Sequence, residues 1–265
     1  MTYETLAIER PSPEVVVAQL DRPERLNAMS FTMFDELSTL QTEVEEDAAA
    51  RVLILTGAGR AFCAGMDLEQ ALTLPQMSAT EMLRRQESWA RAIAGFRRLR
   101  TPVIAAVNGA AAGAGMALAL AADIRIASPT ARFNAAFVRI GLSGGDVGTS
   151  WLLPRLVGFG RASELLLTGR FVEAEEALRI GMVTEVTDAD ELLPRALEIA
   201  EVIRGNSPLG MQLTKQVLQT NVDAPSLEAA IELENRNQVL TTRTHDMAEA
   251  FEAFREKRPP KFTGS

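Results

Sequence analysis

The stretch PVIAAVNGAAAGAGMALALAADIRIAS, residues 102–128, decides the fold class of this chain. It opens with a short apolar run, turns at Gly109, continues through a segment rich in alanine and leucine (residues 110–123), and ends with a second apolar run. Short apolar runs that end at a turn are typical of buried strands, whereas alanine and leucine favour a helix. The stretch therefore predicts strand, turn, helix and strand, which is the repeat of an α/β fold.

The same order recurs on both sides of this stretch. Apolar runs bounded by turn residues predict further strands at residues 14–20, 51–59 and 131–141. Apolar residues at helical spacing predict helices at residues 30–49, 77–99, 148–158 and 161–169. Ser30 is the expected N-cap of the first of these helices.

The character of the chain changes after Val186. Strand patterns cease there, and residues 191–205, 208–219 and 226–240 are all amphipathic helix patterns. We therefore expect two regions, an α/β core over residues 1–186 and a helical region over residues 187–265. The apolar stripes of the helical region can pack on the core, on a neighbouring subunit, or on both.

Composition excludes several classes of function. A chain of 265 residues with 47% apolar and 23% charged residues is expected to fold around a sizeable core. Its net charge of −8 argues against nucleic-acid binding, and no apolar segment is long enough to span a membrane. A single cysteine, Cys63, excludes an intramolecular disulfide and points to the cytoplasm. Metal-ligand spacing is absent, and the lone His245 has no evident nucleophile partner.

Four motifs in a fixed order carry a resemblance to a known family. They are DRPERLNAMS (21–30), GAGRAFCAGMDL (57–68), the stretch at 102–128, and GLSGGDVGTSWLLPRLVG (141–158). This order resembles the crotonase family, also called the enoyl-CoA hydratase/isomerase superfamily. The resemblance implies a spiral of repeated ββα units, a C-terminal helical trimerisation region, and assembly as a homotrimer or a dimer of trimers. It also implies an acyl-CoA thioester as substrate, with coenzyme A as part of that substrate and no separate cofactor.

The resemblance assigns two backbone amides, of Met66 and Ala114, to an oxyanion hole. Chemistry next to a thioester places negative charge on the carbonyl oxygen, and fixed N–H donors stabilise that charge. For coenzyme A, the resemblance implies a set of residues in the first two motifs and in the C-terminal segment. This set is Arg25, Ala28, Ala64, Gly65, Asp67, Leu68, Lys261 and Phe262. Asp67 is also suited to stabilising the turn, and residues 261–262 to a frayed tail.

The chain departs from the hydratase pattern at two positions. Typical hydratases of the family carry two glutamates that handle water, and the matching residues here are Ala117 and Phe137. Neither side chain can donate or accept a proton, so the usual hydration mechanism does not carry over. Both residues are expected to line an apolar substrate pocket.

Asp146 is the candidate acid–base residue, because other branches of the family carry an aspartate in this turn. Asp146 can also cap the following helix. Burial would raise its pKa and the helix start would lower it, so the sequence leaves the direction open. Double-bond isomerisation through Asp146 is the favoured function. The alternatives are a hydratase with one carboxylate, an Asp146 nucleophile in a hydrolase or dehalogenase, and a thioester-binding protein without turnover. Glu81 or Glu87 would supply a second carboxylate, although a solvated helix face is the favoured interpretation for both.

Overall fold

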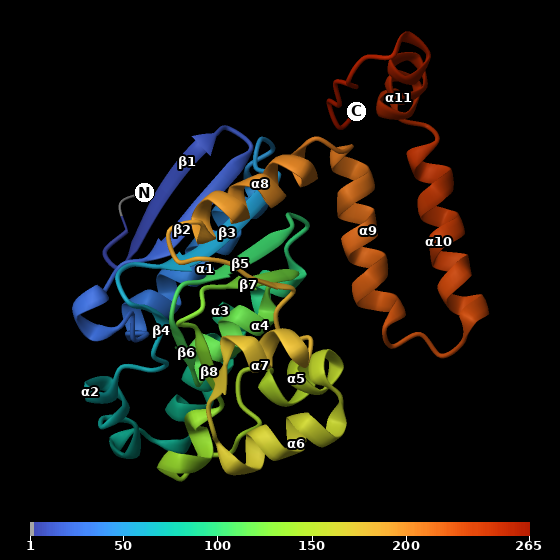
Figure 1. Cartoon of the computed structure of the whole chain (residues 1–265). Helices are drawn as coiled ribbons and strands as arrows, with labels where there is room; N and C mark the ends of the chain where they lie inside the picture. The colour runs from blue at the N-terminus through green and yellow to red at the C-terminus, as the bar shows by residue number, and fades with distance from the viewer. Residues whose placement is uncertain (1–2) are drawn as a thin grey trace.

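The structure is a computed structural model that describes residues 3–265. Its strands form two sheets (Figure 1). The larger sheet has the order β1-β2-β3-β5-β7-β10 and the smaller one the order β4-β6-β8-β9. The strands of the larger sheet are β1 (Leu6–Ser12), β2 (Val15–Leu20), β3 (Val52–Gly57), β5 (Val103–Val107), β7 (Ile124–Ala127) and β10 (Glu185–Val186). Those of the smaller sheet are β4 (Ala61–Cys63), β6 (Ala110–Ala112), β8 (Arg132–Asn134) and β9 (Val172–Glu173).

Successive pairs of strands contribute one strand to each sheet. The pairs β3/β4, β5/β6 and β7/β8 all follow this rule, and helices follow each pair. The helices of this part of the chain are α1 (Phe31–Glu46), α2 (Leu68–Ala71), α3 (Ala79–Arg98), α4 (Ala114–Ala121), α5 (Thr149–Val157), α6 (Phe159–Thr168) and α7 (Ala174–Arg179). Short 3-10 helices are η1 (Pro23–Arg25), η2 (Leu74–Gln76) and η3 (Ala136–Ile140). The predicted spiral of ββα units is confirmed.

The larger sheet is covered on both faces, which explains its continuous apolar strands. In β3, Leu53 and Leu55 join the main core, whereas Val52 and Ile54 face the other side. That second face packs against α8 (Leu192–Arg204), through residues one helical turn apart such as Leu192 and Ala196. The expected region boundary at residue 186 therefore precedes a helix that packs on the core sheet. The first two residues of the expected core region lie outside the described residues.

Three further helices form an arm that projects from the core (Figure 1). They are α9 (Pro208–Asn221), α10 (Leu227–Thr241) and α11 (His245–Glu256). All four C-terminal helices match the predicted helical region, and no strand occurs after Val186 in the described chain. None of the helices within residues 3–265 has the length and apolar character that a membrane span requires.

Two predicted elements differ from the structure. Residues 110–112 form strand β6 rather than the first turn of a helix, because β4 and β8 lie on either side and supply its hydrogen-bond partners. The strand predicted at 131–141 ends at Asn134, and η3 follows. The N-cap prediction for Ser30 is confirmed, since its side chain accepts a hydrogen bond from the Met33 amide.

Candidate active site

The carboxyl ends of three neighbouring strands meet at one edge of the smaller sheet. β4, β6 and β8 are parallel, with Cys63 paired to Ala111 and Ala112 paired to Asn134. The segments that follow these strands must therefore lie side by side. They are the loop 64–67, the start of α4, and η3. This edge is where open α/β sheets usually bind their ligands.

The loop after β4 leaves the N–H groups of Gly65 and Met66 without an acceptor among residues 3–265. The Met29 amide donates to the Gly65 carbonyl at 2.7 Å, and the Asp67 amide donates to the Met29 carbonyl at 2.9 Å. This is a parallel bridge between Met29 and Met66, in which the N–H of Met66 points away from Met29. The Met66 N–H donates to no acceptor within residues 3–265.

The start of α4 provides further such groups, and the N–H of Ala114 is the first of them. Ala114 is the first residue of the helix, and its N-cap, Gly113, has no side chain to accept the free amides of the first turn. The Ala114 N–H also donates to no acceptor in the described part of the chain. The positive end of the helix dipole adds to the attraction for negative charge at this point.

Two glycines bring these segments into contact. Gly65 has φ of +96°, and a Cβ there would lie 2.9 Å from the Ala112 carbonyl oxygen and 3.8 Å from the Ala114 nitrogen. At Gly115 a Cβ would lie 2.2 Å from the Cys63 carbonyl oxygen, so α4 packs directly on the end of β4. The two N–H groups thus belong to touching segments, as an oxyanion hole requires.

The first motif clamps the loop of Met66. Arg22 pairs with the buried Asp67 at 3.0 Å and donates to the Ala28 carbonyl at 2.6 Å. Asn27 is fully buried and donates to the carbonyls of Ala58 and Ala61, both at 2.8 Å. Burial opposes ionisation of Asp67, but the Arg22 pair and the amides that follow it lower the pKa below its usual value. Asp67 caps α2 through the Glu69 amide, which confirms the turn-stabilising role.

The residues at the two hydratase positions are buried in the same core. Ala117 lies one turn into α4, and Phe137 lies in η3 with only 6% of its surface exposed. The Phe137 ring is 3.6 Å from the position that a Cβ on Gly113 would occupy. An apolar ring therefore lies beside the residue that precedes the Ala114 amide.

Asp146 is half-buried between α3 and the start of α5. Its Oδ1 accepts a hydrogen bond from Nε2 of Gln86 on α3 and another from the Val147 amide at 2.8 Å. Burial raises the pKa of Asp146, and the two hydrogen bonds only partly offset this effect. The sequence left open whether the pKa of Asp146 is raised or lowered, and in the structure it is raised. The capping interpretation is wrong, because the N-cap of α5 is Gly148 and no side chain caps that helix.

Most of the residues expected to hold coenzyme A lie around the loop 64–68. Arg25 pairs with Glu69 at 2.9 Å, the Ala64 amide donates to the Leu26 carbonyl, and Leu68 is largely exposed. Lys261 and Phe262 are not part of this group. The Phe262 carbonyl accepts a hydrogen bond from Arg51, which directly precedes β3, so the tail lies at the opposite end of that strand.

Glu81 and Glu87 match the favoured interpretation of a solvated helix face. Both are exposed and pair with arginines one turn along α3, as a solvated helix face does. Sequence reasoning missed Gln86, although a signal was present. Gln86 occupies a position of the apolar stripe formed by Met82, Trp89 and Ile93, where a polar side chain needs a partner.

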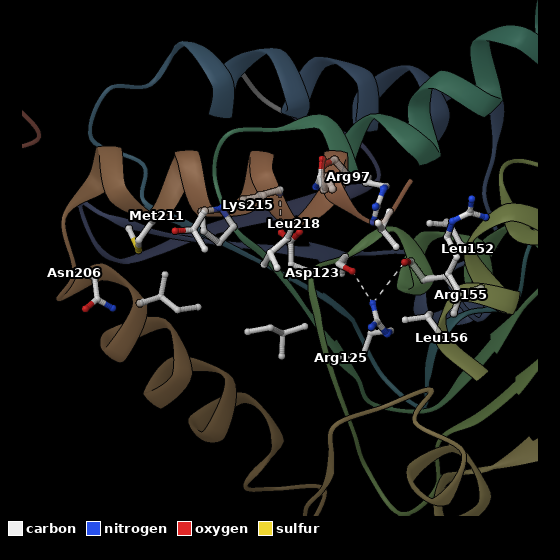
Figure 2. A pocket seen from close by; sticks show the side chains of 18 of the residues that line it. Arg97, Asp123, Arg125, Leu152, Arg155, Leu156, Asn206, Met211, Lys215 and Leu218 are labelled. Atoms are coloured by element: carbon white, nitrogen blue, oxygen red, sulfur yellow. Dashed lines mark hydrogen bonds and ion pairs between the residues drawn. The ribbon is translucent and has the colours of Figure 1, made fainter. Parts of the chain in front are cut away.

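A cavity of about 650 Å³ lies elsewhere, between α9 and the core (Figure 2). It adjoins the carboxyl end of α4, where Arg125 donates to the Ala122 carbonyl at 2.6 Å. The charged Lys215 in its wall pairs with Asp123 at 2.7 Å. The residues that line it do not include Met66 or Ala114, whose amides are the candidate oxyanion donors.

The ββα spiral and its paired amides define a crotonase-fold protein. A family model described as enoyl-CoA hydratase/isomerase matches residues 11–265, and the chain belongs to this family of enzymes. An acyl-CoA thioester substrate is consistent with that membership.

Three relatives illustrate the range of the family. A probable enoyl-CoA hydratase of Mycobacterium tuberculosis is 43% identical over 267 residues, which cover 99% of this chain and 94% of the relative. The 1,2-epoxyphenylacetyl-CoA isomerase of Escherichia coli is 39% identical over 251 residues, covering 94% and 95%. The crystal structure of a probable enoyl-CoA hydratase/isomerase from Mycobacterium abscessus superposes with a TM-score of 0.91 at 40% identity, covering 99% and 100%.

Proposed function

We propose that this enzyme isomerises acyl-CoA thioesters by proton transfer through Asp146. The amides of Met66 and Ala114 bind the thioester oxygen as it gains negative charge. Each such donor contributes roughly 3 to 4 kcal/mol to stabilising the transition state. The residues of the loop 64–68, with Arg25 and Ala28, hold coenzyme A.

The reaction needs one base and no water. With a 3-enoyl thioester, Asp146 removes a proton from C2, and the electron pair of that C–H bond spreads over the dienolate. The carboxyl group then returns the proton to C4, which leaves a double bond between C2 and C3. Electrons and protons balance without a redox partner, so we propose that no separate cofactor takes part.

The observation that carries this proposal is the environment of Asp146. A half-buried carboxylate with a raised pKa both accepts and returns a proton more readily near neutral pH than an exposed one. The apolar Ala117 and Phe137 provide no group that would activate water. A relative at 39% identity is named an isomerase, which favours this chemistry among those known in the family.

The test follows hydrogen exchange and isomerisation of 3-hexenoyl-CoA in heavy water. The wild-type enzyme is expected to form 2-hexenoyl-CoA and to incorporate deuterium at C4 or C2. Asp146→Asn should lower the rate by a factor of about 10² to 10⁴, because it removes the base but keeps the shape. Asp35→Asn, on the exposed face of α1, is the matched control and should leave the rate unchanged.

Each alternative has its own signature in the same assay. A hydratase would convert 2-hexenoyl-CoA to the 3-hydroxy product in an Asp146-dependent reaction. A nucleophilic Asp146 would incorporate ¹⁸O from labelled water into its carboxylate after turnover. Binding of hexanoyl-CoA with no exchange and no product would identify a binding protein. Any of these results without isomerisation would overturn the proposal.

We further propose that the chain acts in the cytoplasm as a homotrimer or a dimer of trimers assembled through the helical arm. The arm carries large apolar side chains in contact with solvent, a feature that marks subunit interfaces. They include Leu218, Val239, Phe251 and Phe254, with Phe254 86% exposed.

Light scattering after size-exclusion chromatography tests the assembly. The wild-type mass should be three or six times the 28.7 kDa of one chain. Phe254→Asp should shift the mass toward one chain while circular dichroism stays unchanged. Leu167→Asp is the control, because Leu167 is similarly exposed but lies on α6, away from the arm (Figure 1). A monomeric wild-type protein would refute the proposed assembly.

A further inference from the structure

Gln86 is a polar residue at an inward-facing position of α3. The stripe of this helix that packs on the core includes Met82, Trp89, Ile93 and Phe96, and Gln86 falls between the first two at helical spacing. A side-chain amide in such a stripe requires a hydrogen-bond partner, because an unpaired buried amide destabilises the fold. Its partner is the carboxylate of Asp146.

The hydrogen bonds to Asp146 are unevenly distributed between its two oxygens. Oδ1 accepts both the Gln86 Nε2–H and the Val147 N–H. Oδ2 accepts no hydrogen bond from any residue in the range 3–265. One oxygen is thus fixed by two donors, and the other remains available to a ligand.

The two donors differ in how they are held. Val147 has φ of +39°, a backbone conformation that a β-branched residue rarely adopts, so its N–H is set by the local chain. Gln86 reaches Asp146 from a different element, 60 residues away in sequence. The Gln86 contact therefore fixes the turn of Asp146 to α3, which in turn packs on α4 and its Ala114 amide.

The charged side chains near this turn lie against residues other than Asp146. On α3, Glu81 and Arg85 face each other at 3.8 Å, and the Arg85 guanidinium also lies over the Phe31 ring. On α5, Arg155 pairs with Asp223 at 2.7 Å. Arg139 in η3 lies toward Gly169. The pKa of Asp146 is accordingly governed by burial, which raises it, and by the Val147 and Gln86 donors, which lower it.

We propose that Gln86 is the positioning residue of Asp146: it fixes Oδ1 and favours the ionised carboxylate, so that Oδ2 exchanges protons with the substrate. This inference rests on the proposed isomerase function. Gln86 itself transfers no proton, because a neutral amide has no suitable acid or base group. The inference gives α3 a role in the reaction beyond packing.

The test measures the pH dependence of kcat/KM for 3-hexenoyl-CoA isomerisation. A base must be ionised, so the rate rises with pH through the pKa of Asp146. Gln86→Leu removes a donor that stabilises the carboxylate, and the acidic limb of the profile should move up by about one pH unit. Gln86→Met keeps the length of the side chain and also removes the donor. It should give the same shift, which would exclude a packing effect of leucine as the cause. Glu87→Gln, an exposed neighbour on α3, is the control and should not move the limb.

Two further measurements separate a positioning role from a structural one. Affinity for hexanoyl-CoA should stay unchanged in Gln86→Leu, since the thioester donors are intact. A lower kcat with the acidic limb in place would show that Gln86 only supports the fold, and would overturn the inference. If Asp146→Asn abolishes hydrogen exchange but neither Gln86 variant moves the acidic limb of the pH profile, the role of Gln86 is refuted and the proposed function stands. Full activity in Asp146→Asn would refute both the proposed function and this inference.

Discussion

At the scale of single residues, the free N–H of Met66 depends on Gly65. The positive φ of this glycine turns the chain, and its missing side chain lets the Ala112 carbonyl approach. Gly65→Ala should therefore impose both backbone strain and a contact of 2.9 Å with that oxygen. We expect the free energy of unfolding to fall by more than backbone strain alone would cause. Isomerase activity should fall at least about 10²-fold, which is the effect of losing one oxyanion donor.

Gly158→Ala is the matched control for this prediction. Gly158 has a similar φ of +82°, but a Cβ there would have no neighbour within 4 Å. Only strain should remain, about 1 to 3 kcal/mol of unfolding free energy, with activity per folded molecule preserved. Urea unfolding and initial rates measure both quantities. Equal effects of the two substitutions on activity would show that the approach of Gly65 to Ala112 does not position the Met66 amide.

Residues of the candidate site differ in how far the sequence predicts them. Met66, Ala114 and the clamp residue Asp67 lie at strand ends, so their positions follow from the order of motifs. The prediction that Asp146 caps α5 was wrong, because Gly148, with φ of +92°, occupies the N-cap position instead. The Gln86 contact joins residues 60 positions apart, and only the packing of α3 against the Asp146 turn reveals it.

At the scale of elements, burial on both faces made most strands of the larger sheet predictable. The strand β1 was not predicted, because it lies at the sheet edge, is largely solvent-accessible and contains Pro11. The strand β6 was mistaken for helix because alanine favours helices in isolation. Its strand form comes from the neighbours β4 and β8, which no local pattern encodes.

A second element-scale feature is the anchoring of the C-terminal tail to α11. The buried carboxylate of Asp246 accepts hydrogen bonds from the Thr263 amide at 2.8 Å, the Gly264 amide at 3.1 Å and the Ser207 hydroxyl at 2.8 Å. Burial opposes its ionisation, but these donors lower its pKa below the usual value. The anchor should thus be complete above about pH 4 and weaken as the pH falls through the lowered value.

Asp246→Asn should release the tail at neutral pH, because an amide has one acceptor oxygen instead of two charged ones. Carboxypeptidase digestion followed by mass spectrometry measures this release, and we expect removal of the last residues to be at least about tenfold faster. Asp188→Asn, an exposed change in the loop before α8, should leave the digestion rate unchanged. An unchanged rate in Asp246→Asn would show that other contacts hold the tail without Asp246. These are Arg51 to the Phe262 carbonyl, the Lys261 amide to Glu249, and the His245 amide to the Ser265 carbonyl.

At the scale of the whole molecule, the tail and the candidate site of one chain lie at opposite ends of β3. Arg51, which contacts Phe262, precedes this strand, and the loop of Met66 follows β4 beyond its other end. Six residues of strand span about 20 Å, so the segment held by Arg51 lies well away from the loop of Met66 in its own chain. If Lys261 and Phe262 bind coenzyme A, we expect them to do so in the site of a neighbouring subunit of the proposed trimer.

Mixed oligomers test this arrangement directly. One chain carries Asp146→Asn with an intact tail, and the other ends at Pro260 but keeps Asp146. Each alone should be nearly inactive, because every site lacks either the base or the tail. In a trimer assembled at random from equal amounts, about a quarter of the sites combine an intact Asp146 with a tail from the next subunit, and activity should return to about that fraction. Mixing the two oligomers after assembly should restore nothing. Full activity of the truncated chain alone, or no recovery in co-assembled trimers, would show that the tail does not complete a neighbour's site.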